Sequence, residues 1–197
     1  MVISNEKIIY EKLVSIYPNN IKPITQLSMN TTDNKIFIES SYTAFDFDTV
    51  ENLHIDGTSS LHSSPDSLFL CNDILYFIEF KEGKAKSADI RSKIHEALST
   101  LFNFCLTHIP NFTKEDFFSL RIRYAVFLSQ GNPASFLDVL ETSKKRFSLK
   151  NLEGYLLNKS SVVNCPHATH KILTKLSSGQ LGKTTIYNRD YPSTCFN

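Results

Sequence analysis

Residues 64–84, SPDSLFLCNDILYFIEFKEGK, constrain the fold of this chain more than any other stretch. Two apolar runs, 67–71 and 74–81, meet at the dipeptide Asn72-Asp73. Short apolar runs joined by two residues of this kind are typical of a β-hairpin with a tight turn. The sequence therefore predicts two antiparallel strands that pair from the turn outward.

Successive side chains of a strand point to opposite faces, so the run 74–81 divides into two sets. The first set becomes charged toward its end: Leu75, Phe77, Glu79 and Lys81. The second set is apolar throughout: Ile74, Tyr76, Ile78 and Phe80. A strand with apolar residues on both faces is typical of burial on both sides. Two charged side chains on such a strand are costly unless they are paired or bind a ligand.

A two-residue turn also sets the register of the hairpin, because it places Cys71 opposite Ile74. Continued outward, this register brings Asp66 directly opposite Glu79. Carboxylates so placed have Cβ atoms about 4.5–5.5 Å apart and repel each other. Lys81 can supply part of the positive charge that the pair needs. A divalent cation suits the remainder, since Mg²⁺ commonly takes one or two carboxylates.

Two carboxylates, a divalent cation and a lysine suit the hydrolysis of a phosphodiester bond. Such a cation polarises a phosphoryl oxygen and lowers the pKa of a bound water. A lysine beside it can orient that water or stabilise the charge that develops on the phosphate. From the residues alone, we therefore predict phosphodiester chemistry at this end of the hairpin.

The same residues carry a resemblance to a known family. Pro65-Asp66, a spacer of twelve residues and then Glu79-Phe80-Lys81 resemble the motif of the PD-(D/E)XK nuclease superfamily. The resemblance implies that Asp66 and Glu79 are ligands of Mg²⁺ or Mn²⁺ and that Lys81 is the catalytic lysine. It also implies that the backbone carbonyl of Phe80 is a further ligand. The alternative is structural, since Pro-Asp commonly opens a turn and Glu-x-Lys can form an exposed ion pair.

Further residues follow from the resemblance. Many family members add an acidic ligand from an earlier helix, for which Glu51 is the first candidate and Glu11 the second. His62 matches relatives in which a histidine joins the metal and favours Mn²⁺. Relatives often use the helix after the motif to reach the phosphate or the water. We therefore count these basic residues as candidate nucleic-acid contacts: Lys84, Arg91, Lys93 and, in a basic loop near the C-terminus, Lys183.

The rest of the chain predicts an α/β fold with a mixed central sheet flanked by helices. Helices are expected over 4–17, 87–108, 134–145 and 166–176, strands over 35–40 and 120–128, and a helical turn over 49–53. A crossover helix between strands 74–81 and 120–128 makes those two strands parallel. The order helix–strand–hairpin–helix–strand over residues 5–128 resembles the restriction-endonuclease-like core. We place this core within 1–145 and assign 146–197 to a basic C-terminal extension.

Charge and hydropathy indicate the partners. From Lys144 onward the chain has nine Lys or Arg and two acidic residues, whereas the preceding part has 12 basic and 18 acidic residues. This asymmetry favours a polyanion at the C-terminal part. The chain has no run of 18 apolar residues, and its start, MVISNEKIIYEKLVSIYP, predicts an amphipathic helix and not a signal peptide. We therefore expect a cytoplasmic protein without a membrane partner.

The prediction as a whole is a metal-dependent endonuclease that hydrolyses nucleic acid, with DNA favoured over RNA. A homodimer is included because many enzymes of this kind dimerise to cut two strands. The alternative from another class is a non-catalytic nucleic-acid-binding or assembly protein on the same fold. That alternative predicts binding that weakens steeply with salt, without cleavage.

Overall fold

The computed structural model describes residues 3–53, 59–61, 63–82, 86–129, 147–188 and 192–197. The helices are α1 (Asn5–Ile16), η1 (Pro18–Asn20), α2 (Ile24–Leu27), α3 (Ser87–His108), α4 (Lys114–Ser119), η2 (Leu149–Leu152) and α6 (Pro166–Leu176). The first strands are β1 (Ile21–Pro23), β2 (Met29–Asn30), β3 (Lys35–Ile36), β4 (Ile38–Glu39), β5 (Thr43–Asp46), β6 (Glu51–Leu53) and β7 (Ser59–Leu61). The later strands are β8 (Ser67–Cys71), β9 (Ile74–Glu82), β10 (Ile122–Ser129), β11 (Lys159–Val163), β12 (Thr184–Ile186) and β13 (Thr194–Phe196).

The predicted hairpin is formed by β8 and β9. Their antiparallel ladder runs from the pair Cys71–Ile74 to the pair Ser67–Ile78, as the sequence predicts. Asn72 and Asp73 both have positive φ, 51° and 53°. A two-residue turn with positive φ at both positions matches the twist of the strands that it joins, and Asn and Asp tolerate this backbone conformation. The turn therefore sets the register on which the site depends.

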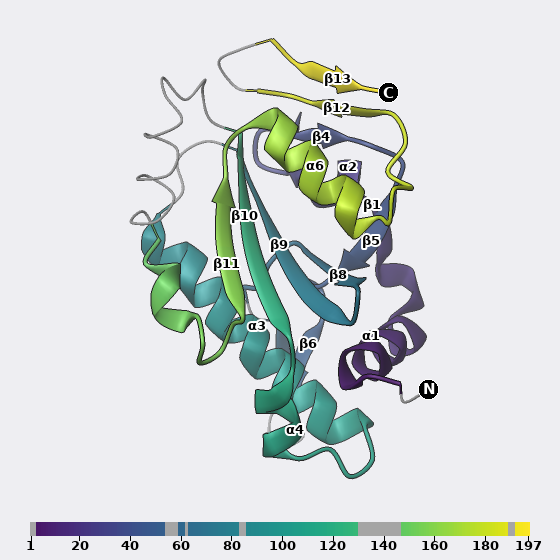
Figure 1. The fold of residues 1–197 in the computed structure, drawn as a ribbon, viewed down its shortest axis with the longest axis vertical. Helices are drawn as coiled ribbons and strands as arrows, with labels where there is room; N and C mark the ends of the chain where they lie inside the picture. Colours follow the sequence, from purple (N-terminus) through teal and green to yellow (C-terminus); the bar gives the residue numbers. More distant parts are fainter. Residues whose placement is uncertain (1–2, 54–58, 62, 83–85, 130–146, 189–191) are drawn as a thin grey trace.

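The hairpin lies inside a mixed six-stranded sheet with the strand order β1-β5-β8-β9-β10-β11 (Figure 1). β9 and β10 are parallel, which confirms the prediction from the crossover helix. That helix is α3, which begins and ends at the predicted residues, Ser87 and His108. Among the described helices, none has the length and apolar character needed to cross a membrane.

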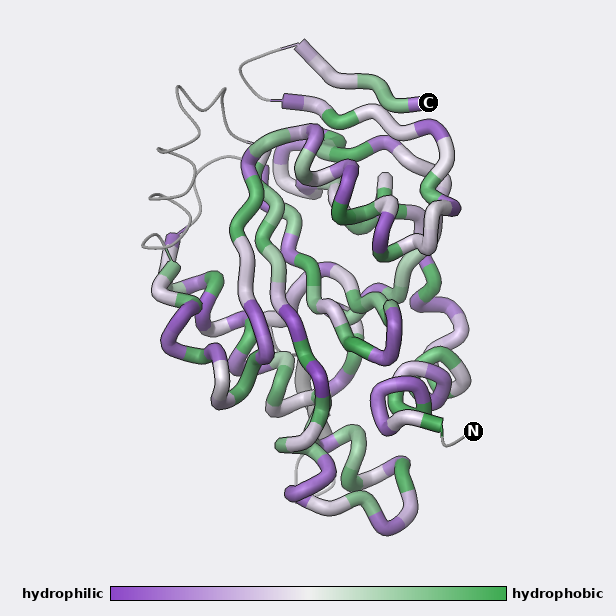
Figure 2. Tube along the Cα trace, viewed as in Figure 1, coloured by the Kyte–Doolittle hydropathy of each residue, from purple (hydrophilic) through white to green (hydrophobic). Residues whose placement is uncertain are grey.

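Hydrophobic cores cover both faces of the sheet. Leu75 and Phe77 of β9 belong to one core, into which α1 and α3 also pack. Tyr76, Ile78 and Phe80 belong to the other core, which includes residues of α6, β4 and β12. Figure 2 shows hydrophobic residues along the central strands, whereas each long helix contains both hydrophobic and hydrophilic residues along its length. The predicted division of β9 into two buried faces is confirmed.

Two short segments differ from the prediction. Residues 35–40 do not form one strand, because β3 pairs with β2 whereas β4 pairs with β12, which is more than 140 residues away in sequence. The segment expected as a helical turn at 49–53 contains the strand β6, which pairs with β7. In both cases a partner strand decided the local conformation, and tertiary context commonly overrides local propensity in this way.

The described residues after 146 are packed into the fold. β11 pairs in parallel with β10 at the edge of the central sheet. Leu149, Leu152 and Leu157 are buried in the core on the α3 side of the sheet. Leu173 and Leu176 of α6 are buried in the core on the other side. This part therefore completes the sheet and covers one of its faces, where the sequence predicts an extension outside the core. The helix predicted at 134–145 lies outside the described residues.

Candidate functional site

Strand β9 brings the predicted site residues together near its C-terminal end. The side chain of Glu79 is fully buried and shares a face with Leu75 and Phe77. Asp66 immediately precedes β8, at the position that the hairpin register places opposite Glu79. The backbone N–H of Phe80 donates a 2.6 Å hydrogen bond to Oδ2 of Asp66. This bond orients the Asp66 carboxylate toward β9.

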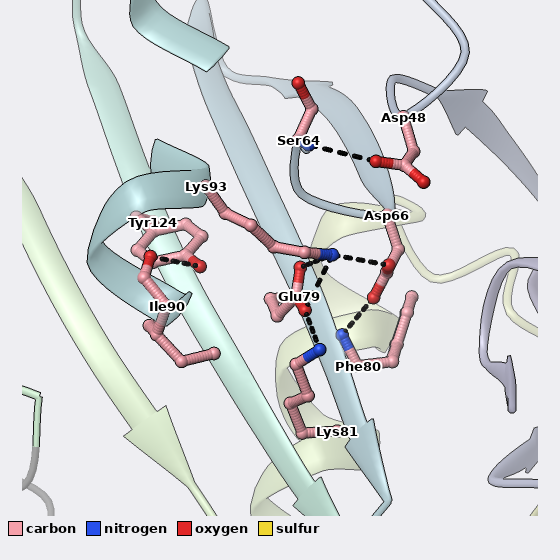
Figure 3. Close-up of polar contacts among 9 residues, drawn as sticks. All are labelled: Asp48, Ser64, Asp66, Glu79, Phe80, Lys81, Ile90, Lys93 and Tyr124. Carbon is pink, nitrogen blue, oxygen red and sulfur yellow. Dashed lines mark hydrogen bonds and ion pairs between the residues drawn. The ribbon is translucent and has the colours of Figure 1, made fainter. Parts of the chain in front are cut away.

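Two lysines neutralise the two carboxylates (Figure 3). Nζ of Lys81 lies 2.8 Å from Oε1 of Glu79. Nζ of Lys93, which comes from α3, lies 3.0 Å from the same oxygen and 3.5 Å from Oδ1 of Asp66. The side chain of Lys93 is 13% exposed, so its charge is largely removed from water. We call Asp66, Glu79, Lys81 and Lys93 the carboxylate–lysine cluster.

The electrostatics of this cluster show competing effects. Burial, and after it the neighbouring Glu79 carboxylate, raises the pKa of Asp66 to about 8, although Lys93, the Phe80 N–H and Lys81 act in the opposite direction. Burial alone would lower the pKa of Lys93, but the carboxylates of Asp66 and Glu79 outweigh it and raise that pKa above its usual value. Lys93 therefore stays charged at neutral pH, while Asp66 releases its proton at a higher pH than an ordinary carboxyl does.

Asp48 and Tyr124 surround the cluster. Oδ1 of Asp48, in the turn after β5, accepts a 3.0 Å hydrogen bond from the N–H of Ser64, and its charge adds to those that raise the pKa of Lys93. The hydroxyl of Tyr124 donates to the carbonyl of Ile90 at 3.5 Å. Burial, followed by Glu79 and Asp66, raises the pKa of Tyr124.

Sequence analysis missed Asp48 as an acidic group near the site. The signal available was the alternation Phe45-Asp46-Phe47-Asp48, which places two carboxylates at and just beyond the end of a buried strand. Asp46 proves to be structural, since its Oδ2 lies 2.6 Å from Nζ of Lys22.

Glu51 and Glu11, the predicted third acidic ligands, lie elsewhere. Glu51 is exposed on β6, and among the described residues no hydrogen bond or ion pair joins it to Asp66 or Glu79. Its charge acts on Tyr17, whose pKa is raised by burial first and by Glu51 second. Glu11 is exposed on α1 and lies 3.8 Å from Lys7. The prediction of Glu51 as a ligand assumed an acidic residue on a helix that faces the site, whereas Glu51 belongs to the strand β6.

The predicted nucleic-acid contacts lie in different surroundings. Lys93 belongs to the carboxylate–lysine cluster, Arg91 is half-buried on the same helix, and Lys183 is exposed just before β12. Lys84 and His62 lie outside the described residues. Of these candidates, the structure therefore brings Lys93 directly to the two carboxylates.

The donor set determines what kind of cation this site could take. Within the described ranges, no group of three or more His, Cys, Asp or Glu side chains is arranged to hold a metal ion. Asp66 and Glu79 offer two carboxylates, and Oε1 of Glu79 is buried without a hydrogen bond despite its two ion pairs. Two carboxylates are enough for a cation that keeps most of its water ligands, as Mg²⁺ does. They are too few for a cation whose ligands all come from the protein.

The chain matches no protein-family model, no curated protein and no solved structure.

Proposed function

We propose that this protein is a metal-dependent nuclease that hydrolyses phosphodiester bonds, with DNA favoured over RNA as substrate. The observation that carries the proposal is the carboxylate–lysine cluster. Two carboxylates lie side by side on a buried hairpin, and two lysines from different elements reach them. Like charges are seldom placed together in a protein core without a functional reason, and perturbed pKa values concentrate at functional sites.

The arrangement of the surrounding elements supports the proposal. The resemblance to the PD-(D/E)XK superfamily implies a helix, a strand, a hairpin, a helix and a strand parallel to the hairpin. In this chain α1, β5, the hairpin β8–β9, α3 and β10 follow in that order, with β5 in the place where the sequence predicts the strand 35–40. β5, β8, β9 and β10 are also neighbours in the sheet in that order.

The proposed roles follow from the contacts of each residue. Asp66 and Glu79 would hold Mg²⁺ or Mn²⁺, and the carbonyl of Phe80 remains a predicted ligand. The cation would polarise the phosphoryl oxygen and lower the pKa of a bound water. Lys81, whose side chain is 31% exposed, is accessible enough to orient the attacking water or to stabilise charge on the phosphate. Lys93 is more deeply buried and holds the two carboxylates in place.

One observation favours the second candidate, a non-catalytic nucleic-acid-binding or assembly protein on the same fold. The carboxyl groups of Asp66 and Glu79 already have Lys81 and Lys93 as partners, so the cluster contains positive charge without a metal cation. A buried ionic cluster of this kind can specify the fold without having any catalytic role. The two candidates differ in one measurable property, which is metal-dependent cleavage.

The test is cleavage of labelled single- and double-stranded DNA and RNA in EDTA, Mg²⁺ or Mn²⁺. The wild type is compared with Lys81→Ala and Glu79→Gln, and with Lys171→Gln as a control, since Lys171 is an exposed lysine on α6. We expect cutting that requires the metal, is reduced at least 100-fold in both site variants and is unchanged in the control. Binding without cleavage by a folded wild type under every condition would refute the nuclease proposal and favour the second candidate. A homodimer, if formed, would appear in the sedimentation of the same samples.

A further inference from the structure

A pocket lies between β10, β11 and α6, on the face of the sheet opposite the carboxylate–lysine cluster. Its volume is about 230 Å³, and Tyr76, Arg123, Lys159, Ser161 and Lys175 are among the residues that line it. Figure 1 shows β11 at the edge of the central sheet, with α6 beside the upper part of the strands. The pocket is therefore lined in part by the edge strand β11 and is separated from the carboxylates by the sheet itself.

Three cations meet at this pocket. Arg123 and Lys159 are direct partners in the parallel ladder of β10 and β11, and Lys175 approaches from α6. Like charges on directly opposite residues of neighbouring strands repel each other. We call Arg123, Lys159 and Lys175 the basic triad.

The described part of the chain gives the basic triad no carboxylate partner. None of its three residues forms an ion pair there. Hydrogen bonds from Ser160, and more weakly the charges of Lys150 and Lys159, lower the pKa of the Glu153 carboxyl. That carboxylate accepts the N–H and hydroxyl of Ser160 at 2.8 and 2.7 Å and does not line the pocket. Within the described residues, the charge of the triad is thus not balanced by an ion pair, and it is available to an anionic ligand.

Contacts with Tyr76 hold the guanidinium group of Arg123 in place and leave some of its N–H groups without an acceptor. Its guanidinium carbon lies 5.5 Å from the centroid of the Tyr76 ring, and Nη1 donates to the Tyr76 hydroxyl at 3.2 Å. Its Nε is buried and has no hydrogen-bond partner among the described residues. A guanidinium has five N–H donors in a planar fork, which matches the oxygens of a phosphate or carboxylate. A buried donor without an acceptor is costly, so an acceptor in the pocket would stabilise it.

We propose that the basic triad binds a phosphate monoester. Three cations suit a dianion, and the fork of Arg123 can bind two of its oxygens while the Ser161 hydroxyl is available to a third. The pocket is smaller than most sites for drug-sized ligands, so it fits the phosphate and a small organic part. The ring of Tyr76 and the side chain of Ile172 would contact that organic part. The proposal does not depend on the nuclease proposal, because none of the four residues of the carboxylate–lysine cluster lines the pocket and the two sites lie on opposite faces of the sheet.

The same phosphate could come from a free phosphorylated small molecule or from the end of a nucleic-acid strand. Calorimetric titrations at low salt, in EDTA so that no cleavage occurs, distinguish the two sources. The ligands are inorganic phosphate, adenosine 5′-monophosphate, and one oligodeoxynucleotide with and without a 5′-phosphate. The proteins are the wild type, Arg123→Gln, Lys159→Gln and Lys175→Gln. The matched control is Lys171→Gln, which removes the same charge from α6 outside the pocket.

We expect inorganic phosphate to bind the wild type, with affinity reduced about tenfold or more in Arg123→Gln and severalfold in the two lysine variants. Lys171→Gln should bind like the wild type. Affinity should also rise between pH 5 and 7, because the second ionisation of a phosphate monoester lies near pH 6. Tighter binding of the nucleotide would assign the pocket to small molecules. A gain on adding the 5′-phosphate to the oligonucleotide would assign it to strand ends.

Three results would overturn the proposal. The first is a wild type that binds neither phosphate nor the nucleotide. The second is an equal loss in Lys171→Gln, which would mean that the positive surface acts only diffusely. The third is an oligonucleotide that binds equally well with and without its 5′-phosphate and weakens equally in Lys159→Gln, since the site would then contact phosphodiesters. Lys159 and Lys175 are exposed, so their variants remain informative even if Arg123→Gln folds poorly.

Discussion

Each face of the central sheet has a pair of side chains of like charge type at neighbouring strands, and the two pairs differ in their partners. Asp66 just before β8 and Glu79 of β9 form one pair, and Arg123 of β10 and Lys159 of β11 form the other. Asp66 and Glu79 on one face are neutralised by Lys81 and Lys93 from the same chain. Arg123 and Lys159 on the other face have no carboxylate partner in the described residues. The first pair can be buried because its counterions are built in. The second pair stays at the sheet edge, where an external anion can reach it.

This difference gives opposite expectations for removing a charge from each site. In the carboxylate–lysine cluster, removing the charge of Glu79 leaves the buried ammonium of Lys93 without its nearest carboxylate, so the fold should lose stability. In the basic triad, removing the charge of Lys159 or Lys175 relieves repulsion, so the fold should gain a little stability.

Glu79→Gln should lower the free energy of unfolding by about 3–5 kcal/mol, because Lys81 and Lys93 would lose their shared carboxylate while Lys93 remains buried. Urea denaturation measures the change. Glu11→Gln removes the same charge from an exposed ion pair and should change the stability little. Equal stability of the two variants would show that the cluster is not an electrostatic unit.

Asp66→Asn should change how stability depends on pH. The raised pKa of Asp66, about 8 against 3.8 for the ordinary carboxyl, means that the folded state holds a proton that the unfolded state has released. The wild type should therefore lose stability between pH 5 and 7, by up to about 1.4 kcal/mol per pH unit. The asparagine variant should lack this decline.

Denaturation of both proteins across this pH range measures the effect of Asp66. Asp33→Asn, at an exposed position, should keep the wild-type slope. If Asp66→Asn and the wild type had parallel profiles, Asp66 would be ionised in the folded protein and the assigned shift would be wrong.

Lys93→Gln should strengthen the binding of Mn²⁺ about tenfold at pH 9, since Lys93 competes with a cation for both carboxylates. The alkaline pH favours the ionised form of Asp66, whose pKa is raised by burial and lowered by Lys93. Calorimetry is the measurement, and Lys86→Gln, an exposed residue at the start of α3, is the control. This prediction rests on the proposed metal site. Weaker binding in Lys93→Gln than in the control would mean that Lys93 positions the carboxylates more than it competes.

Lys159→Gln should raise the free energy of unfolding by a few tenths of a kcal/mol in buffer without phosphate, because it removes the repulsion with Arg123 across the ladder. Thermal unfolding at low salt measures this small change in stability, and Lys171→Gln is again the control. Added phosphate should reverse the ranking, since it stabilises the wild type, which binds it more tightly, by the larger amount. A loss of stability without phosphate would show that Lys159 has an internal partner.

The contrast also shows where sequence analysis succeeded. The alternation of β9, the turn at Asn72-Asp73 and the crossover by α3 depend on local rules, and the structure agrees with each. Those rules predict that Asp66 and Glu79 meet, because a two-residue turn leaves the hairpin one register. Lys93 was predicted as a nucleic-acid contact because it lies on the helix after the motif. Its position in the sequence does not predict that its ammonium lies between the two carboxylates.

What the sequence by itself determined is the hairpin, its two buried faces and the order of helix and strand around it, because these follow from periodicity and turn chemistry between near neighbours. Only the tertiary structure decided which acidic residue approaches Lys93, how 35–40 divides between two sheets, and that β11 faces β10 with Lys159 opposite Arg123. These contacts join segments that are distant in sequence. Their geometry depends on how whole layers pack, a quantity that no local pattern contains.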